Sequence, residues 1–250
     1  MAGVAGRTYK TEAIVLRSLR FSEADRILHL YTSTRGRVGA IAKGARKTKS
    51  RFGGRLEPLS HVELMLHEGS GELHTVTGVD LLRSHRRARE DPYRLAVGLI
   101  AAEAMLRLFG EPEANERAFN ALDRFLELLD DAPVLAPLRP ALDPLALSFQ
   151  LKLLWLSGYL PHVTSCVECG STAGLVGFSP RAGGAVCLEH ASGAQPLSAE
   201  GLTGVEQLLS TPLADAHAAG LSERARREAL CVVTSSYEEH GGFRLRTLSA

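Results

Sequence analysis

Residues 26–42 read RILHLYTSTRGRVGAIA and contain two short strand patterns joined by a turn. Apolar and polar side chains roughly alternate over residues 26–31, and an apolar run at residues 38–42 follows the turn residues 32–36. A period of two in β-branched and aromatic residues favours strands, while Thr, Ser and Gly favour a turn. The stretch therefore predicts two neighbouring strands and places this part of the chain in a β domain.

Similar patterns lie on both sides of these two strands. Residues 13–16 form an apolar run before them, and residues 61–67 and 73–77 follow as a further pair around the turn at residues 69–71. Five short strands in one segment fit a small barrel such as the OB-fold, which commonly binds oligonucleotides. An SH3-like barrel would give the same strand count, so the count leaves the topology open.

Beyond residue 82 the apolar period becomes helical. Asp91 followed by Pro92 is a typical helix start, because Asp caps the first turn and Pro fits its first position. The apolar spacing predicts helices at residues 92–109, 113–129, 145–156, 199–208 and 222–238. Cys231 lies in an apolar run of the last helix and is expected to be a buried hydrophobic residue. We therefore predict an α+β, multidomain chain, with a barrel domain at residues 1–82 and an all-helical domain at residues 83–250.

The net charge of the 250-residue chain is +1, and this small value hides a strong asymmetry. Residues 1–90 contain 17 Lys or Arg and 9 Asp or Glu, a net charge of +8, whereas residues 91–250 carry a net charge of −7. The barrel region is therefore suited to a polyanion, because phosphate neutralisation supplies much of the affinity for nucleic acid. The acidic segment, residues 91–250, is suited instead to binding other proteins.

The positive charge is densest between the third and fourth predicted strands, where no acidic residue interrupts residues 35–55. The candidate DNA-binding residues in this segment are Arg35, Arg37, Lys43, Arg46, Lys47, Lys49, Arg51, Phe52 and Arg55. The cations would neutralise phosphates, and Phe52 would either stack on an unpaired base or pack in the core. A charge run of this kind is equally typical of a solvated surface loop, so its function needs a second line of support.

Three of the four cysteines form a metal-ligand pattern with one histidine. Cys166 and Cys169, followed by Cys187 and His190, give the spacing C-x2-C-x17-C-x2-H. Two such pairs can bring four ligands to one tetrahedral point, which is the closed geometry of a structural zinc site. We therefore predict a zinc finger at about residues 162–192, inserted in the helical domain. The alternative is a coincidental spacing of reduced cysteines.

The sequence contains no recognisable active site, so we expect a protein that is not an enzyme. His61 and Glu63 match part of a nucleobase deaminase motif, but Ser165 stands where that motif has a proline before Cys166. Four protein ligands would also leave a bound metal no open position. The sequence lacks a G-x-x-x-x-G-K-[ST] phosphate loop and an H-E-x-x-H metal motif.

The chain carries no pattern that directs it to a membrane. Residues 1–7 lack the apolar core of a signal peptide, and the most apolar long segment, residues 95–109, is interrupted by Glu103 and Arg107. We therefore expect a cytoplasmic protein without a membrane partner.

Five stretches of the sequence form a recognisable combination. They are TEAIVLR at residues 11–17, SEADRI at residues 22–27, AKGARKTKSRFGG at residues 42–54, LEP at residues 56–58 and LLWLSGYLP at residues 153–161. The third stretch is the most distinctive, and the last one precedes the first cysteine pair. In these motifs and in the order of its domains, essentially the whole chain resembles the RecO family of bacterial DNA repair proteins.

This resemblance implies an N-terminal OB-fold, a helical domain that carries a zinc finger in many members, and a recombination mediator without catalytic turnover. It implies binding of single- and double-stranded DNA, annealing of complementary strands and association with the nucleoid. The implied protein partners are RecR, single-stranded-DNA-binding protein and, indirectly, RecA. His190 departs from the family pattern, because relatives with zinc usually have a fourth cysteine there.

Two other classes of protein compete with this interpretation. An RNA-binding or ribosome-associated factor with a small barrel and a zinc ribbon would need the same positive charge, and a comparison of DNA and RNA affinities separates the two. A metal-dependent hydrolase is disfavoured, because it needs an open metal position and paired catalytic groups.

Overall fold

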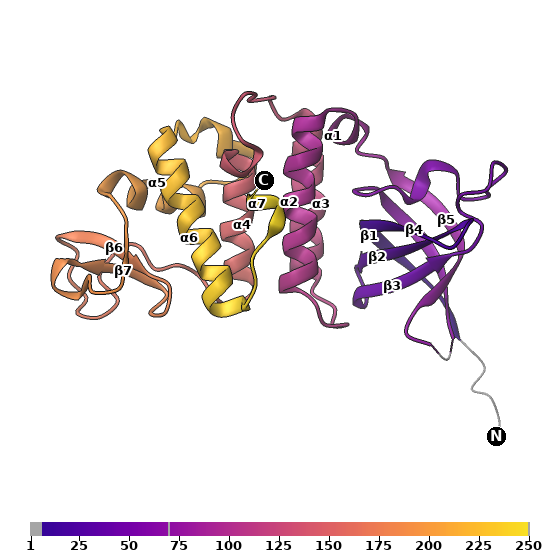
Figure 1. Cartoon of the computed structure of the whole chain (residues 1–250), viewed down its shortest axis with the longest axis horizontal. Helices are drawn as coiled ribbons and strands as arrows, with labels where there is room; N and C mark the ends of the chain where they lie inside the picture. The colour runs from indigo at the N-terminus through magenta and orange to yellow at the C-terminus, as the bar shows by residue number, and fades with distance from the viewer. Residues whose placement is uncertain (1–6, 70, 250) are drawn as a thin grey trace, which may run out of the picture. The chain divides into compact units, whose positions relative to one another are not determined.

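The computed structural model describes residues 7–69 and 71–249 (Figure 1). The chain divides into two compact units, Met1–Asp131 and Ala132–Ala250. The sequence-based division at residue 82 marks the change from strand to helix patterns, whereas packing groups the first three helices with the barrel. The division into domains at residues 1–82 and 83–250 stays a prediction.

Five strands of the first unit form a closed barrel: β1 (Arg7–Phe21), β2 (Asp25–Thr32), β3 (Gly36–Ala42), β4 (His61–Glu68) and β5 (His74–Arg83). The strand order is β1-β2-β3-β5-β4, and β4 pairs back with β1. The β3–β5 pair is parallel, and the other pairs are antiparallel. This order is that of the OB-fold, so the predicted barrel is confirmed and the parallel pair decides its topology.

Alternating residues of the strands fill the barrel. Leu28 and Leu30 of β2 and Ala40 of β3 point inward and are fully buried, so the residues between them face outward. β1 is longer than the apolar run that predicted it, because its first half pairs with β4 and its second half with β2. A bulge between Val15 and Arg17 bends the strand between these two partners.

Three helices follow the barrel in the first unit: α1 (Arg86–Glu90), α2 (Pro92–Leu108) and α3 (Glu116–Asp131). Asp91 accepts the N–H of Arg94 and Pro92 occupies the first turn of α2, which confirms the predicted start of this helix. Gly98 lets α2 approach the barrel closely, because a Cβ at this position would lie 2.5 Å from Cδ1 of the buried Leu59.

The second unit is a helical body with a small inserted sheet. Its helices are η2 (Pro140–Leu142), α4 (Pro144–Leu156), η3 (Leu188–His190), α5 (Ala199–Ser210), η4 (Leu213–Ala219), α6 (Glu223–Gly241) and α7 (Arg246–Ser249). α4 is buried along most of its length and packs against α5 and α6. Nζ of Lys152 on α4 donates to the carbonyls of Leu208 and Thr211 and so caps the C-terminal end of α5.

A three-stranded sheet lies between α4 and α5 in the chain. It consists of β6 (Leu175–Ser179), β7 (Gly184–Cys187) and β8 (Gln195–Pro196), in the order β7-β6-β8. The antiparallel β6–β7 pair lies in the chain between Cys169 and the end of the second ligand pair.

The prediction that Cys231 is buried is wrong. Its side chain is exposed on α6. Residues Ala229, Val232 and Val233 form the buried stripe of this helix, and position 231 lies outside that stripe.

None of the helices within residues 7–69 and 71–249 is long and apolar enough to cross a membrane.

Candidate nucleic-acid interface and metal centre

The densest positive charge lies on residues 43–55, in the connection between β3 and β4, and we call this segment the basic loop. Two backbone donors attach its start to the β1–β2 hairpin. The N–H of Gly44 donates to Oδ1 of Asp25 over 2.8 Å, and the N–H of Arg46 donates to the carbonyl of Ala24 over 2.8 Å. Gly44 has a φ of 70°, a conformation that glycine adopts without strain. The basic loop is thus fixed beside the hairpin at its beginning.

Phe52 anchors the other part of the basic loop in the barrel. Its ring is 1% exposed and belongs to the barrel core, as does Leu56 in the short helix η1 (Gly53–Leu56). The guanidinium of Arg51 lies 4.8 Å from the centre of the Phe52 ring and covers it. Of the two roles that the sequence left open for Phe52, the structure therefore shows core packing, and the buried ring offers no platform for a base.

Seven of the eight predicted cations are exposed: Arg37, Lys43, Arg46, Lys47, Lys49, Arg51 and Arg55. Arg35 is the partly exposed one. It forms an ion pair with Glu68 over 2.8 Å, and its guanidinium lies 3.9 Å from the centre of the Tyr9 ring. Because its charge is already paired, Arg35 is the least available of the eight for an external phosphate.

The lysines of the basic loop have the most accessible charge. Within the residues that the structure describes, Lys43, Lys47 and Lys49 have no carboxylate partner. Arg46 donates to two carbonyls of the β1–β2 hairpin, and Arg55 donates to a carbonyl of the basic loop itself. Backbone carbonyls do not neutralise a guanidinium, so the whole loop remains positively charged.

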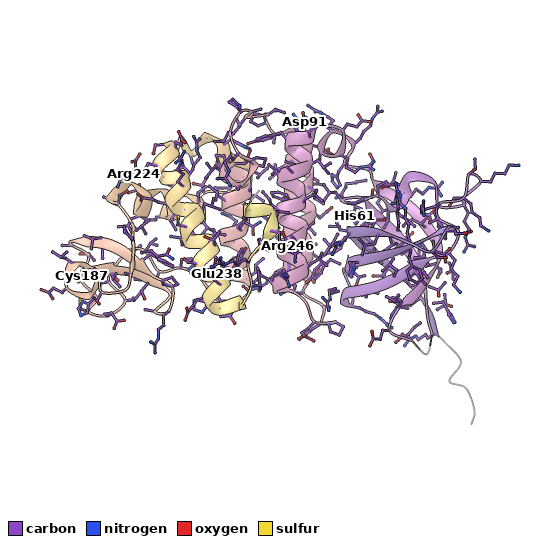
Figure 2. All side chains as sticks on the ribbon, in the orientation of Figure 1. His61, Asp91, Cys187, Arg224, Glu238 and Arg246 are labelled. Atoms are coloured by element: carbon purple, nitrogen blue, oxygen red, sulfur yellow. The ribbon has the colours of Figure 1, made fainter. Side chains whose placement is uncertain are left out.

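The four predicted metal ligands come together at one point, near the end of β7, where Cys187 is labelled in Figure 2. Their ligand atoms all lie within 4.8 Å of one another. Sγ of Cys169 is 3.8 Å from Sγ of Cys187, and Nδ1 of His190 is 3.8 Å from Sγ of Cys166 and 3.2 Å from Sγ of Cys187. A tetrahedral zinc ion requires S–S separations of about 3.8 Å and S–N separations of about 3.6 Å. The four residues therefore fit a tetrahedral metal ion.

Local backbone geometry prepares the first ligand pair. Gly170, with a φ of 75°, donates its N–H to the carbonyl of Cys166 and closes the turn between Cys166 and Cys169. Burial by itself favours the neutral thiol of Cys166, but backbone N–H groups of Cys187, Cys169 and Glu168 donate to its sulfur and hold its pKa below the usual range. The thiolate is the form that binds metal, and a set of four protein ligands is typical of structural zinc.

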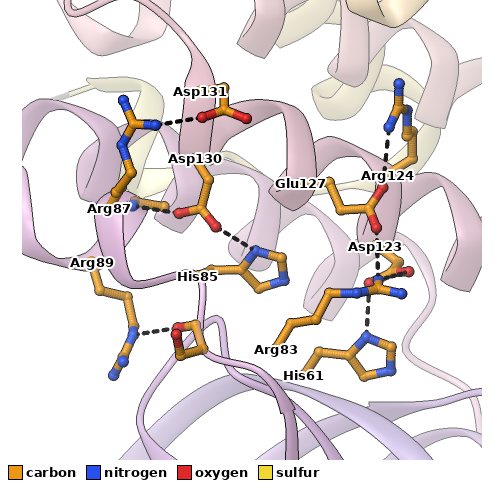
Figure 3. Close-up of polar contacts among 12 residues, drawn as sticks. His61, Arg83, His85, Arg87, Arg89, Asp123, Arg124, Glu127, Asp130 and Asp131 are labelled. Carbon is orange, nitrogen blue, oxygen red and sulfur yellow. Dashed lines mark hydrogen bonds and ion pairs between the residues drawn. The ribbon is translucent and has the colours of Figure 1, made fainter.

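Sequence reasoning missed a polar cluster that joins the barrel to α3 (Figure 3). Nδ1 of the buried His61, at the start of β4, lies 2.8 Å from Oδ1 of Asp123 on α3. Arg83, at the end of β5, contacts Asp123 and also lies 2.9 Å from Glu127. Burial favours the neutral form of Asp123, but His61 and Arg83 outweigh it and lower the pKa of Asp123 to about 2. The partners are distant in sequence, so no local pattern could have revealed the cluster.

The comparisons with known proteins cover both units. Residues 6–85 match the family described as "Recombination protein O N terminal", and residues 89–249 match "Recombination protein O C terminal". A relative from Rubrobacter xylanophilus, named "DNA repair protein RecO", is 41% identical over 226 residues, which are 88% of each chain. Relatives of the same name from Anaeromyxobacter sp. (strain K) and Thermoanaerobacter sp. (strain X514) are 35% and 30% identical, over 94% of this chain and 92% and 93% of their own lengths. The chain therefore belongs to the RecO family of DNA repair proteins.

Proposed function

We propose that this protein is a DNA-binding recombination mediator that works in DNA repair at the nucleoid. It binds single- and double-stranded DNA and anneals complementary strands. With RecR, it helps to load RecA on DNA coated with single-stranded-DNA-binding protein. Membership of the RecO family supports the role in DNA repair. Direct contact with DNA is supported by the geometry of the basic loop.

The observation that carries this proposal is the group of three lysines without carboxylate partners in the described chain, Lys43, Lys47 and Lys49, on a loop that is anchored to the barrel at both ends. A lysine ammonium is a point charge that binds phosphate without reading the base. Such contacts give an affinity that is independent of sequence, which a protein that anneals any two complementary strands requires. The mediator would work by binding alone, without a catalytic step.

We further propose that Cys166, Cys169, Cys187 and His190 hold a structural Zn²⁺ ion. The ligand-atom spacing in the structure supports this assignment. When bound, zinc would stabilise the fold of the β6–β7 region, because the free energy of metal binding is largely folding free energy.

A charge-neutralised variant tests the DNA contact. Lys43→Ala, Lys47→Ala and Lys49→Ala together should weaken binding of every DNA sequence alike. The slope of log affinity against log salt concentration should also become smaller in magnitude by about 2 for single-stranded DNA, since each neutralised phosphate contributes about 0.7 to this slope. The matched control is Arg86→Ala, Arg117→Ala and Arg181→Ala, which removes the same charge from exposed positions outside the basic loop.

The two triple variants separate a specific contact from a net-charge effect. If the loop variant keeps the wild-type salt slope, or if the control flattens the slope as much, the basic loop is not the DNA-binding site. An annealing assay without ATP, on strands coated with single-stranded-DNA-binding protein, tests the mediator function. Tighter binding of RNA than of DNA at matched salt, together with no annealing, would instead favour the ribosome-associated alternative.

A further inference from the structure

The outer face of the β1–β2–β3 sheet carries a row of apolar side chains that the barrel core does not use. Leu19 of β1 pairs with Ile27 of β2, which pairs with Ile41 of β3, and we call these three residues the outer apolar row. Ile27 lies one residue before the inward-pointing Leu28, so the row faces away from the core. All three side chains are partly exposed.

Phe21 extends this row at the end of β1. It lies two residues beyond Leu19 and therefore on the same face, and its ring is 48% exposed. Phe21 is opposite Asp25, the residue whose carboxylate accepts the N–H of Gly44 at the start of the basic loop. The exposed aromatic ring thus lies on the hairpin to which the basic loop is attached, whereas Phe52 within the loop is buried.

The connection between β4 and β5 reaches the same face. A Cβ on Gly39 would lie 2.8 Å from Cδ2 of Leu73, so the glycine gives Leu73 room to lie over β3. Gly39 precedes Ile41 by two residues and shares its face, and Leu73 is 37% exposed. In OB-folds, the strand 2–3 face and the connections β1–β2 and β4–β5 form the surface that binds oligonucleotides. Here Phe21, the last residue before the β1–β2 connection, and Leu73, in the β4–β5 connection, each contribute an exposed apolar side chain to it.

Cations flank the outer apolar row. Arg17 pairs with His29 in the row next to Leu19, and Arg37 lies two residues before Gly39 on the same face; both arginines are exposed. Burial and then the charges of Arg17 and Arg37 lower the pKa of His29, which places two guanidinium groups around this histidine. The exposed Glu23 at the hairpin tip is a carboxylate close to this face. An apolar strip between cations is complementary to a chain of bases joined by phosphates.

We propose that Phe21 stacks on an unpaired base of single-stranded DNA and that the outer apolar row supports the neighbouring bases. The inference rests on the proposed function and deepens it, because it assigns single-strand preference to a surface distinct from the phosphate-binding lysines. In a duplex the bases are paired and stacked on one another, so their faces do not reach Phe21 and only the phosphates are bound.

Substitution of Phe21 distinguishes the two kinds of contact. Loss of a base–aromatic stack weakens single-strand binding by about 5-fold or more. Phe21→Ala should therefore raise the Kd for an oligo-dT strand by at least about 5-fold. The Kd for a blunt duplex and the salt slope should stay near wild type, because Phe carries no charge. Met65→Ala is the matched control, since Met65 is 37% exposed on β4 of the same barrel, where it pairs with Gly78 of β5. Equal losses on the single strand and the duplex, or no loss on either, would overturn the inference.

A fluorescence measurement tests stacking directly. Trp155 is the only tryptophan of the chain, so Trp155→Phe combined with Phe21→Trp places a single reporter on the proposed platform. Saturation with oligo-dT should quench its emission, and the same reporter at position 65 should respond little. DNA binding without quenching at position 21 would refute the stacking role while leaving the proposed function intact. A failure of the wild-type protein to bind DNA would instead refute the proposed function itself.

Discussion

Replacement of Asp123 by Asn should destabilise the unit that contains the barrel, and the effect should depend on pH. Asp123 is the carboxylate between His61 and Arg83 in the polar cluster that joins α3 to the barrel. Its pKa falls from 3.8 to about 2 in the folded protein. The substitution keeps the size of the side chain and removes its charge, so the change in stability reports on the charge itself.

The magnitude follows from the pKa. A shift of this size corresponds to about 2 kcal/mol in the free energy of unfolding at pH 7, since one pKa unit is about 1.4 kcal/mol. The folded protein has the lower pKa, so the contribution is fully present above pH 4 and is lost as the pH falls toward about 2. We expect Asp123→Asn to cost about 2 kcal/mol at pH 7 and about half of that at pH 3.

Urea unfolding of the wild type and the variant at several pH values measures this difference. Hydrogen exchange of peptides from β4 and α3 then locates it in the structure. The control is Asp131→Asn on the same helix, because Asp131 pairs with Arg87 in an exposed position where an ion pair contributes less than about 1 kcal/mol. Surface substitutions usually change the free energy of unfolding by less than about 0.5 kcal/mol. A loss for Asp123→Asn below about 0.5 kcal/mol, or a loss that is the same at pH 7 and pH 3, would therefore contradict the reasoning.

Four further substitutions test other features. Cys169→Ser should abolish stoichiometric zinc in elemental analysis and lower the Tm; a chelator should lower the Tm of the wild type only, and a metal-free wild type of unchanged Tm would contradict the site. Lys152→Met should cost about 1–3 kcal/mol in urea unfolding, because the last carbonyls of α5 lose their donor; an unchanged midpoint would argue against the cap. Burial lowers the pKa of His85, so stability should fall as the pH drops below about 6.5; His85→Asn, which suits the φ of 41°, should flatten this fall between pH 7 and pH 5. Gly98→Ala should lower the Tm despite the better helix propensity of Ala, because the added methyl group meets Leu59; a raised Tm would show that Leu59 moves aside.

The sequence predicts well those features that depend on the spacing of residues close together in the chain. Side chains of a strand that point into a narrow barrel recur at every second residue. Leu28, Leu30 and Ala40 follow this pattern, which can be recognised before any partner strand is known. The four metal ligands can be recognised for the same reason, because the two ligands of each pair are only three residues apart in the sequence. The parallel pairing of β3 with β5 has no such signal, since it depends on how the barrel closes.

Aromatic and polar side chains show where local spacing fails. Phe52 and Phe21 both lie beside an arginine in the sequence, but Phe52 packs into the barrel core, whereas Phe21, at the end of β1, is exposed. Cys231 belongs to an apolar run, yet the helical period places it on the outside of α6. His61 and Asp123 come from β4 and α3, so only the packing of the helices on the barrel makes them partners. Distant contacts decide the direction of Phe52, His61 and Asp123, whereas the exposure of Cys231 follows from the local period of its helix.

The closed order of the strands also has a consequence for the growing polypeptide. β1 borders both β2 and β4, and β5 is the strand that links β3 to β4. During synthesis from the N-terminus, the β1–β2–β3 meander can form early, but the basic loop emerges before β4 and β5 exist. Phe52 and Leu56 have no completed interior to enter until Arg83 has left the ribosome, because β5 ends there. Until the fifth strand is complete, the chain therefore lacks the closed interior into which Phe52 and Leu56 pack, and β3 is without its partner β5.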